Sequence, residues 1–128
     1  MKKQTEAYIQ NQIFIWFHNS YPSLIIHSVP NGIGFNIPKI IPIIFHSAIR
    51  KAIAMAVNLL KLLGMVEGIS DLIIWLPNGR AIMVEVKDAT GKQSSAQIKI
   101  QTKLENIQGV YLLVRSLQDF KEQILKYL

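Results

Sequence analysis

The chain has 128 residues, 14 lysines and arginines against 8 acidic residues, and no cysteine. This length suits one domain with its own core, and the lack of cysteine excludes disulfides and thiolate metal sites. The net charge of +6 favours a polyanionic partner such as nucleic acid. A membrane span is not expected, because the most apolar run, Ile40–Phe45, is short and broken by Pro42. We expect a single domain over 1–128. Residues 1–6 lack the apolar core of a signal peptide, so we expect the protein in the cytoplasm, or in the host-cell cytoplasm if the protein is viral.

Apolar periodicity predicts helices and strands that alternate along the chain. Helices are expected at 5–18, 48–63, 95–106 and from Ser116 onward, and strands at 24–29, in the two arms of a hairpin over 70–87, and at 110–114. The apolar, proline-punctuated segment 31–47 is not assigned. Strand 81–87, helix 95–106 and strand 110–114 would form a right-handed parallel crossover beside the antiparallel hairpin. The predicted fold class is therefore α/β, with a mixed central sheet flanked by helices.

The hairpin turns at Pro77-Asn78-Gly79, a sequence typical of a three-residue loop with Gly79 in the left-handed region. This loop pairs Leu76 with Arg80, and the same register places Asp71 opposite Glu85. Because side chains alternate along a strand, Lys87 falls on the face of these two carboxylates. A two-residue turn would put the carboxylates on opposite faces.

Facing carboxylates repel each other, and a divalent cation between them would remove that repulsion. Carboxylate oxygens suit Mg²⁺ or Mn²⁺, and Lys87 could hold or deprotonate a metal-bound water. Asp71, Glu85 and Lys87 thus provide the groups needed to hydrolyse a phosphodiester. The alternative interpretation is a solvated surface pair of Glu85 with Lys87, since an E-x-K pattern is common.

Two further polar residues lie where the helical pattern predicts apolar ones. In helix 95–106 the apolar stripe consists of Ile100, Leu104 and Ile107, and the position three residues before Ile100 on the same face is Gln97. In helix 5–18 the stripe consists of Ile9, Ile13 and Trp16, and the position three residues before Ile9 on the same face is Glu6. Both would face the sheet from a first helical turn. A capping box with Ser94 could equally explain Gln97, and a favourable acid at a helix N-terminus could explain Glu6.

Three segments together resemble the VRR-NUC domain (virus-type replication-repair nuclease) of the PD-(D/E)XK superfamily. They are 64–72, which ends in Ile69-Ser70-Asp71-Leu72; Glu85-Val86-Lys87; and 91–97, which reads Gly-Lys-Gln-Ser-Ser-Ala-Gln. The likeness extends from Glu6 to about Ser116 and implies a restriction-endonuclease-like core. Its functional residues fall on Glu6, Asp71, Glu85, Lys87 and Gln97. The family usually has proline where this chain has Ser70, a difference that concerns backbone rather than chemistry.

The resemblance implies Mg²⁺- or Mn²⁺-dependent cleavage of structured DNA, with four-way junctions as one candidate substrate. Asp71 and Glu85 would bind the metal, with the Val86 carbonyl as a third ligand. Lys87 would orient or activate the attacking water, Glu6 would act through water, and Gln97 would position Lys87 or the phosphate. The family's short stand-alone members are often viral or bacterial and work as homodimers.

Basic residues near the hairpin in sequence are candidates for contacts with DNA. These are Lys92, Lys99, Lys103, Arg50, Lys51 and Lys61, with the hydroxyl of Ser94 beside them. Two alternatives stay open: a sequence-specific restriction-type nuclease, and a non-catalytic DNA-binding module in which the carboxylates are structural. The complete set of acids with Lys87 argues against the second, because acids facing phosphate do not help a protein that only binds DNA.

Segment 31–47 and helix 48–63 hold more apolar side chains than one small domain can bury. The segment contributes Ile33, Phe35, Ile37, Ile40, Ile41, Ile43, Ile44 and Phe45, and the helix is apolar nearly all round. A surplus of this kind predicts an interface, here a homodimer with two active sites for two strands of a symmetric junction. The alternative is that the segment folds back over its own sheet.

Overall fold

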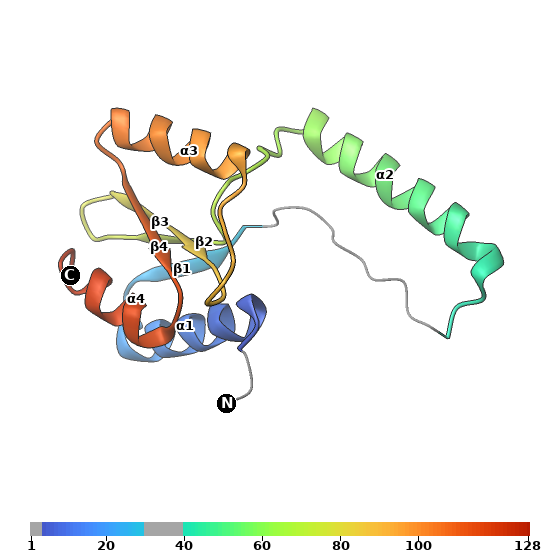
Figure 1. The fold of residues 1–128 in the computed structure, drawn as a ribbon. Coiled ribbons are helices and arrows are strands. Elements are labelled where there is room, and N and C mark those ends of the chain that lie inside the picture. Colours follow the sequence, from blue (N-terminus) through green and yellow to red (C-terminus); the bar gives the residue numbers. More distant parts are fainter. Residues whose placement is uncertain (1–3, 30–39) are drawn as a thin grey trace. The chain divides into compact units, whose positions relative to one another are not determined.

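The computed structural model describes residues 4–29 and 40–128, and Figure 1 shows its elements. The chain divides into two compact units, one formed by Met1–Val29 with Gly68–Leu128 and the other by Pro30–Glu67. The first unit contains the sheet and every candidate catalytic residue. That one domain spans 1–128 stays a prediction.

The sheet of the first unit has four strands in the order β1-β2-β3-β4. The strands are β1 (Ile25–Ser28), β2 (Leu72–Trp75), β3 (Ala81–Val86) and β4 (Val110–Val114). β1 and β2 pair antiparallel, as do β2 and β3, whereas β3 and β4 pair parallel. Helix α3 (Ser95–Asn106) connects the two parallel strands. The predicted mixed α/β sheet flanked by helices is confirmed.

The hairpin between β2 and β3 has the predicted three-residue loop. The Leu76 N–H donates to the Arg80 carbonyl at 2.8 Å, and Gly79 has a φ of 76°. Leu72 pairs with Val84, so facing residues have numbers of constant sum, as the loop requires. A single turn choice therefore sets which side chains share each face of the sheet.

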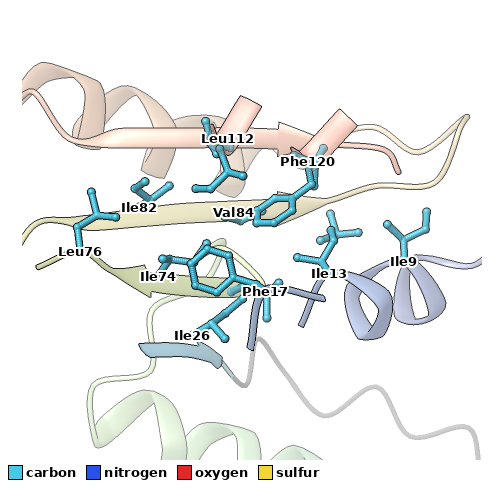
Figure 2. Packing of buried hydrophobic residues seen from close by; sticks show 14 residues of the cluster. Ile9, Ile13, Phe17, Ile26, Ile74, Leu76, Ile82, Val84, Leu112 and Phe120 are labelled. Carbon is cyan, nitrogen blue, oxygen red and sulfur yellow. The ribbon is translucent and has the colours of Figure 1, made fainter. Parts of the chain in front are cut away.

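The core lies on one face of the sheet, beneath α1 (Glu6–Ser20) and α4 (Leu117–Ile124) (Figure 2). The strands supply even-numbered side chains such as Ile74, Ile82 and Val84, none of which is exposed to solvent. Ile9, Ile13 and Phe17 of α1, and Phe120 and Ile124 of α4, pack against them.

Three sequence-based core assignments need correction. Phe17, not Trp16, completes the buried stripe of α1, because residues four apart face the sheet more directly here than residues three apart. Ile107 is 77% exposed because α3 ends at Asn106. Helical spacing predicts that Leu128 continues the inward face of Phe120 and Ile124, but Leu128 is 46% exposed because α4 ends at Ile124.

The described part of the second unit contains a short 3₁₀ helix, η1 (Ile43–Phe45), followed by α2 (His46–Leu62). Gly64, with a φ of 100°, follows the C-cap Leu63 of α2, and Met65 N–H donates to the Leu60 carbonyl at 2.9 Å. Residues 30–39 of the unassigned segment lie outside the described residues.

None of the residues of α2 is buried. By length and composition, the continuous helical segment Ile43–Leu62 is apolar enough to cross a membrane, whereas sequence inspection led us to expect no such segment. The difference arises because Pro42 precedes η1 instead of breaking it, so the apolar run continues into the helix. One such helix is weak evidence for a membrane, since helices with other roles have the same composition.

Candidate active site

Asp71 and Glu85 come together across the hairpin, as the register predicts. Asp71 immediately precedes β2, and its carbonyl accepts a hydrogen bond from the Val29 N–H at 2.9 Å, which holds it beside β1. Its side-chain Oδ2 accepts from the Val86 N–H at 2.8 Å. The Asp71 carboxylate is therefore fixed against the end of β3, next to Glu85.

Glu85 is the centre of the site, and its side chain is completely buried. Its Oε1 accepts from Lys87 Nζ at 2.8 Å and from Gln97 Nε2 at 2.5 Å. Its Oε2 has no hydrogen-bond partner among the described residues. Burial raises the pKa of Glu85 to about 7, and the Asp71 charge adds to this shift while Lys87 opposes it. A buried carboxylate with one unpaired oxygen is costly to maintain in its ionised form unless it takes up a proton or binds a cation.

Lys87 lies between two carboxylates, with its side chain only 11% exposed. Its Nζ is 2.8 Å from Glu85 Oε1 and 4.0 Å from Glu6 Oε1. Burial acts to lower the pKa of Lys87, but the hydrogen bond and charge of Glu85 outweigh it and leave the pKa raised. The side chain in this arrangement is an ammonium ion, suited to stabilise negative charge.

Gln97 both completes the cap of α3 and reaches the side chain of Glu85. Its Oε1 accepts from the Ser94 N–H at 2.7 Å, which completes the capping box of α3. Its Nε2 donates to Glu85 Oε1. The expected partner was Lys87 or a phosphate, whereas the hydrogen bond observed within the protein is with the carboxylate.

Glu6 reaches the site from the first turn of α1, where Thr5 caps the helix. Its Oε1 accepts from the Asp88 N–H at 3.4 Å in addition to its ion pair with Lys87. The placement at a helix N-terminus is favourable in itself, and the catalytic role of Glu6 stays a prediction. The structure thus gathers Glu6, Asp71, Glu85, Lys87 and Gln97 at one place.

Sequence reasoning missed two neighbours of this cluster. A Cβ at Gly91 would lie 2.8 Å from Glu6 Oε1 and 3.3 Å from Lys87 Cδ, so a larger residue there would displace the Glu6 carboxylate and crowd Lys87. The phenol of Tyr111, on β4, is part-buried, and burial and the nearby Glu85 charge raise its pKa well above its usual value. Its signal was available in principle, since Tyr111 is the one polar residue in an otherwise apolar predicted strand.

The candidate DNA contacts fall in three places. Lys92, Lys99 and Lys103 are exposed on or near α3, but Lys99 lies two residues from Gln97 and so faces away from the sheet. Ser94 is the N-cap of α3. The three remaining cations, Arg50, Lys51 and Lys61, belong to α2 in the second unit, and Lys61 pairs with Glu67 at 3.7 Å.

The donor set suits a hard divalent cation. Within residues 4–29 and 40–128, no group of three or more histidine or acidic side chains could hold a metal ion. The vacant Oε2 of Glu85 and the adjacent Asp71 carboxylate nonetheless supply two oxygen donors. Mg²⁺ often binds through one or two carboxylates and otherwise keeps its water. The residues present therefore fit Mg²⁺ or Mn²⁺.

Ser70, which stands where proline is usual, is completely buried. Its Oγ donates to the Leu72 carbonyl at 3.2 Å, so the buried hydroxyl is satisfied within the protein. The substitution therefore leaves no unpaired polar group beside Asp71.

Comparisons with known proteins bear on the family and the fold of the chain. The model of the VRR-NUC domain family matches residues 4–116. A solved structure titled "VRR_NUC domain protein" superposes with a TM-score of 0.65 and 18% identity, covering 100% of this chain and 91% of the other. A second, titled "VRR_NUC domain", has a TM-score of 0.56 and 15% identity, covering 98% and 100%. A search of curated proteins finds no match.

Proposed function

Because the chain belongs to the VRR-NUC domain family, we propose that it is a metal-dependent DNA endonuclease acting at the Asp71, Glu85 and Lys87 site. The domain is a nuclease domain, and its four-stranded mixed sheet is of the PD-(D/E)XK type. The observation that carries the proposal is the buried Glu85 carboxylate, whose Oε2 is vacant while Asp71 lies beside it. Such a pair is unfavourable in a protein that only binds DNA, which argues against the non-catalytic alternative.

Asp71 and Glu85 would hold Mg²⁺ or Mn²⁺, with the Val86 carbonyl as a third donor from the same strand. A bound divalent ion supplies a Lewis acid for the phosphate oxygens and lowers the pKa of a coordinated water. Gln97 fixes Glu85 Oε1, which leaves Oε2 available to the ion.

Lys87 supplies a positive charge beside these carboxylates. Its ammonium would stabilise the negative charge that develops on the phosphate and donate a hydrogen bond to the attacking water. The Glu6 carboxylate, 4.0 Å from this ammonium, would limit its movement. Because the Lys87 pKa is raised in the arrangement described here, we favour this electrostatic role over removal of a proton from water.

We propose branched or otherwise structured DNA, including four-way junctions, as the substrate. The +6 net charge and the exposed lysines on α3 support a nucleic-acid partner. The test is cleavage of labelled duplex, flap and four-way junction substrates with Mg²⁺, with Mn²⁺ and with EDTA. Metal-dependent cleavage of the branched substrates is expected. Cleavage of duplex at one sequence would favour the restriction-type alternative, and no cleavage by wild type alongside tight DNA binding would favour the binding module.

We further propose a homodimer formed through the second unit. Four large apolar side chains there, Ile40, Ile43, Ile44 and Phe45, are between 55% and 90% exposed. Helix α2 buries none of its residues within the chain. Apolar surface of this extent is typical of an interface, and a twofold partner would provide a second active site for the opposite strand.

A further inference from the structure

The loop after Lys87 has a backbone fixed by its own first side chain. Asp88 Oδ1 accepts three hydrogen bonds, from Thr90 N–H at 2.8 Å, Thr90 Oγ1 at 3.0 Å and Gly91 N–H at 2.8 Å. The Gly91 N–H also approaches the Asp88 carbonyl at 3.3 Å. This is the turn-forming behaviour of an aspartate side chain, and it makes residues 88–91 a compact loop at the end of β3.

Arg115 closes this loop from the neighbouring strand. Its Nη1 donates to both carbonyls at the ends of the loop, Asp88 at 2.5 Å and Gly91 at 2.9 Å. The Arg115 backbone is held in turn, because its N–H donates to Asp119 Oδ2 at 2.9 Å at the start of α4. The Lys87 N–H donates to the Val114 carbonyl. Loop 88–91 and Arg115 therefore begin next to each other, at the ends of the paired strands β3 and β4.

Gly91 brings the closed loop against the active-site side chains. A Cβ there would lie 2.8 Å from Glu6 Oε1 and 3.3 Å from Lys87 Cδ. Gly91 is not among the described glycines with positive φ, so a substitution there would act through the space beside Glu6 and Lys87 and not through backbone strain. The loop backbone therefore forms one wall along the Lys87 side chain, while Glu85 and Glu6 bind its ammonium group.

We propose that Arg115 is a positioning residue of the nuclease site, which holds loop 88–91 so that Gly91 confines Lys87 between Glu85 and Glu6. A lysine side chain has a flexible four-carbon stem, and an ammonium that must meet a developing charge loses effectiveness when it is displaced. Arg115 and Gly91 would supply that restraint without touching substrate. The inference rests on the proposed function for its effect on turnover, but its effect on Lys87 is independent of activity.

The competing role for Arg115 is direct binding of a DNA phosphate, because the residue is exposed. The two roles predict different results. If Arg115 binds a phosphate, Arg115→Ala would raise KM and reduce the salt dependence of binding, with kcat unchanged. A positioning role would lower kcat, leave KM and the salt dependence close to wild type, and be reproduced by Gly91→Ala, which changes no charge.

The experiment compares wild type, Arg115→Ala and Gly91→Ala, with Arg80→Ala as the control. Arg80 is an exposed arginine at the hairpin end of the sheet, so its removal makes the same change in charge away from the loop. Hydrogen exchange of the peptide covering 88–91 and the rate of Lys87 acylation are measured in metal-free protein. Initial rates then give kcat and KM on a branched DNA with Mg²⁺ or Mn²⁺.

We expect faster exchange of the loop in Arg115→Ala, several-fold faster acylation of Lys87 in both loop variants, and a roughly ten- to hundredfold loss of kcat. The control should match wild type in each measurement. Unchanged acylation of Lys87 in both variants would overturn the proposal, as would a loosened loop with wild-type kcat. If wild type cleaves no DNA, the nuclease proposal fails, and Lys87 acylation and loop exchange alone then decide whether Arg115 and Gly91 position Lys87.

Discussion

Glu85 and Lys87 form an ion pair of 2.8 Å on one face of β3, with the Glu85 side chain fully buried and that of Lys87 only 11% exposed. The charge of Lys87 only partly offsets the burial of Glu85, whose second oxygen stays unpaired. The pair is therefore poorly explained as a source of stability, since burying charges generally costs more than their attraction returns. It is better explained as a site arranged to receive a cation and a phosphate.

The two acids should be essential for cleavage. Asp71→Ala and Glu85→Ala are expected to abolish metal-dependent cleavage, because each removes one of the two carboxylate donors. Binding of DNA without metal should not weaken, since each substitution removes a negative charge near phosphate. Glu85→Ala also leaves the Lys87 ammonium buried without its partner, so Glu85→Gln is the gentler variant.

Circular dichroism and thermal unfolding should show that Asp71→Ala and Glu85→Gln keep the fold, while cleavage is measured on the branched substrate. The matched control is Glu122→Gln, which neutralises an exposed acid of α4. Cleavage by Glu85→Gln at the rate of this control would exclude Glu85 as a metal ligand.

Lys87 should act in turnover and not in metal binding. Lys87→Ala, or Lys87→Met, which keeps the apolar stem, is expected to retain affinity for Mn²⁺ and to lose about a hundredfold or more in single-turnover rate. Calorimetric titration with Mn²⁺ measures the first quantity and rapid-quench cleavage the second. Near-wild-type cleavage would reject the role assigned to this lysine.

The raised pKa of Glu85 predicts a specific pH dependence of stability. In the folded protein this pKa is about 7, against an ordinary value of 4.5. Folding therefore holds a proton that the unfolded chain releases, so this stabilising contribution is present below pH 4.5 and disappears as the pH rises through 7. The decrease is on the order of 2 kcal/mol, with a fall of several degrees in Tm.

Thermal unfolding in EDTA between pH 5 and 8 tests this dependence, with Glu85→Gln as the reference that cannot titrate. The stability of wild type relative to the variant should fall across this range. Saturating Mn²⁺ should reverse the trend, because a metal binds the ionised carboxylate. Identical pH profiles of the two proteins would contradict the burial effect on Glu85.

The double role of Gln97 can be separated by a neighbouring substitution. Ser94→Ala removes the side chain that accepts from the Gln97 N–H, and so weakens the helix cap by about 1 kcal/mol. Gln97→Ala removes its half of the capping box and the hydrogen bond with Glu85 together. We expect similar decreases of stability in thermal unfolding, but a decrease of kcat only in Gln97→Ala. Equal kcat values for the two variants would make Gln97 a capping residue alone.

Most residues of this site could be predicted from the sequence, because turn type and helical spacing, which depend on neighbouring residues alone, determine their positions. Pro77-Asn78-Gly79 determines the register, and the register places Asp71, Glu85 and Lys87 on one face. Helical spacing was enough to bring Gln97 to that face. By contrast, Arg115 meets loop 88–91 only through the pairing of β4 with β3, and Gly91 lies against Glu6 only because Glu6 arrives from the other end of the chain. Spacing within one segment cannot reveal interactions of that kind.

The proposed homodimer can be tested directly by measuring the molar mass of the protein in solution. Light scattering at micromolar concentration is expected to give twice the monomer mass for wild type. Ile43→Asp and Phe45→Asp place a charge in the apolar surface of η1, where these side chains are 84% and 55% exposed, and should yield monomers. The control is Ile107→Asp in the first unit, which is 77% exposed and should stay dimeric. If the wild-type protein is monomeric but floats with lipid vesicles, Ile43–Leu62 would be assigned to a membrane instead. A monomer would also lack the paired active sites that cleavage of both strands of a symmetric junction requires.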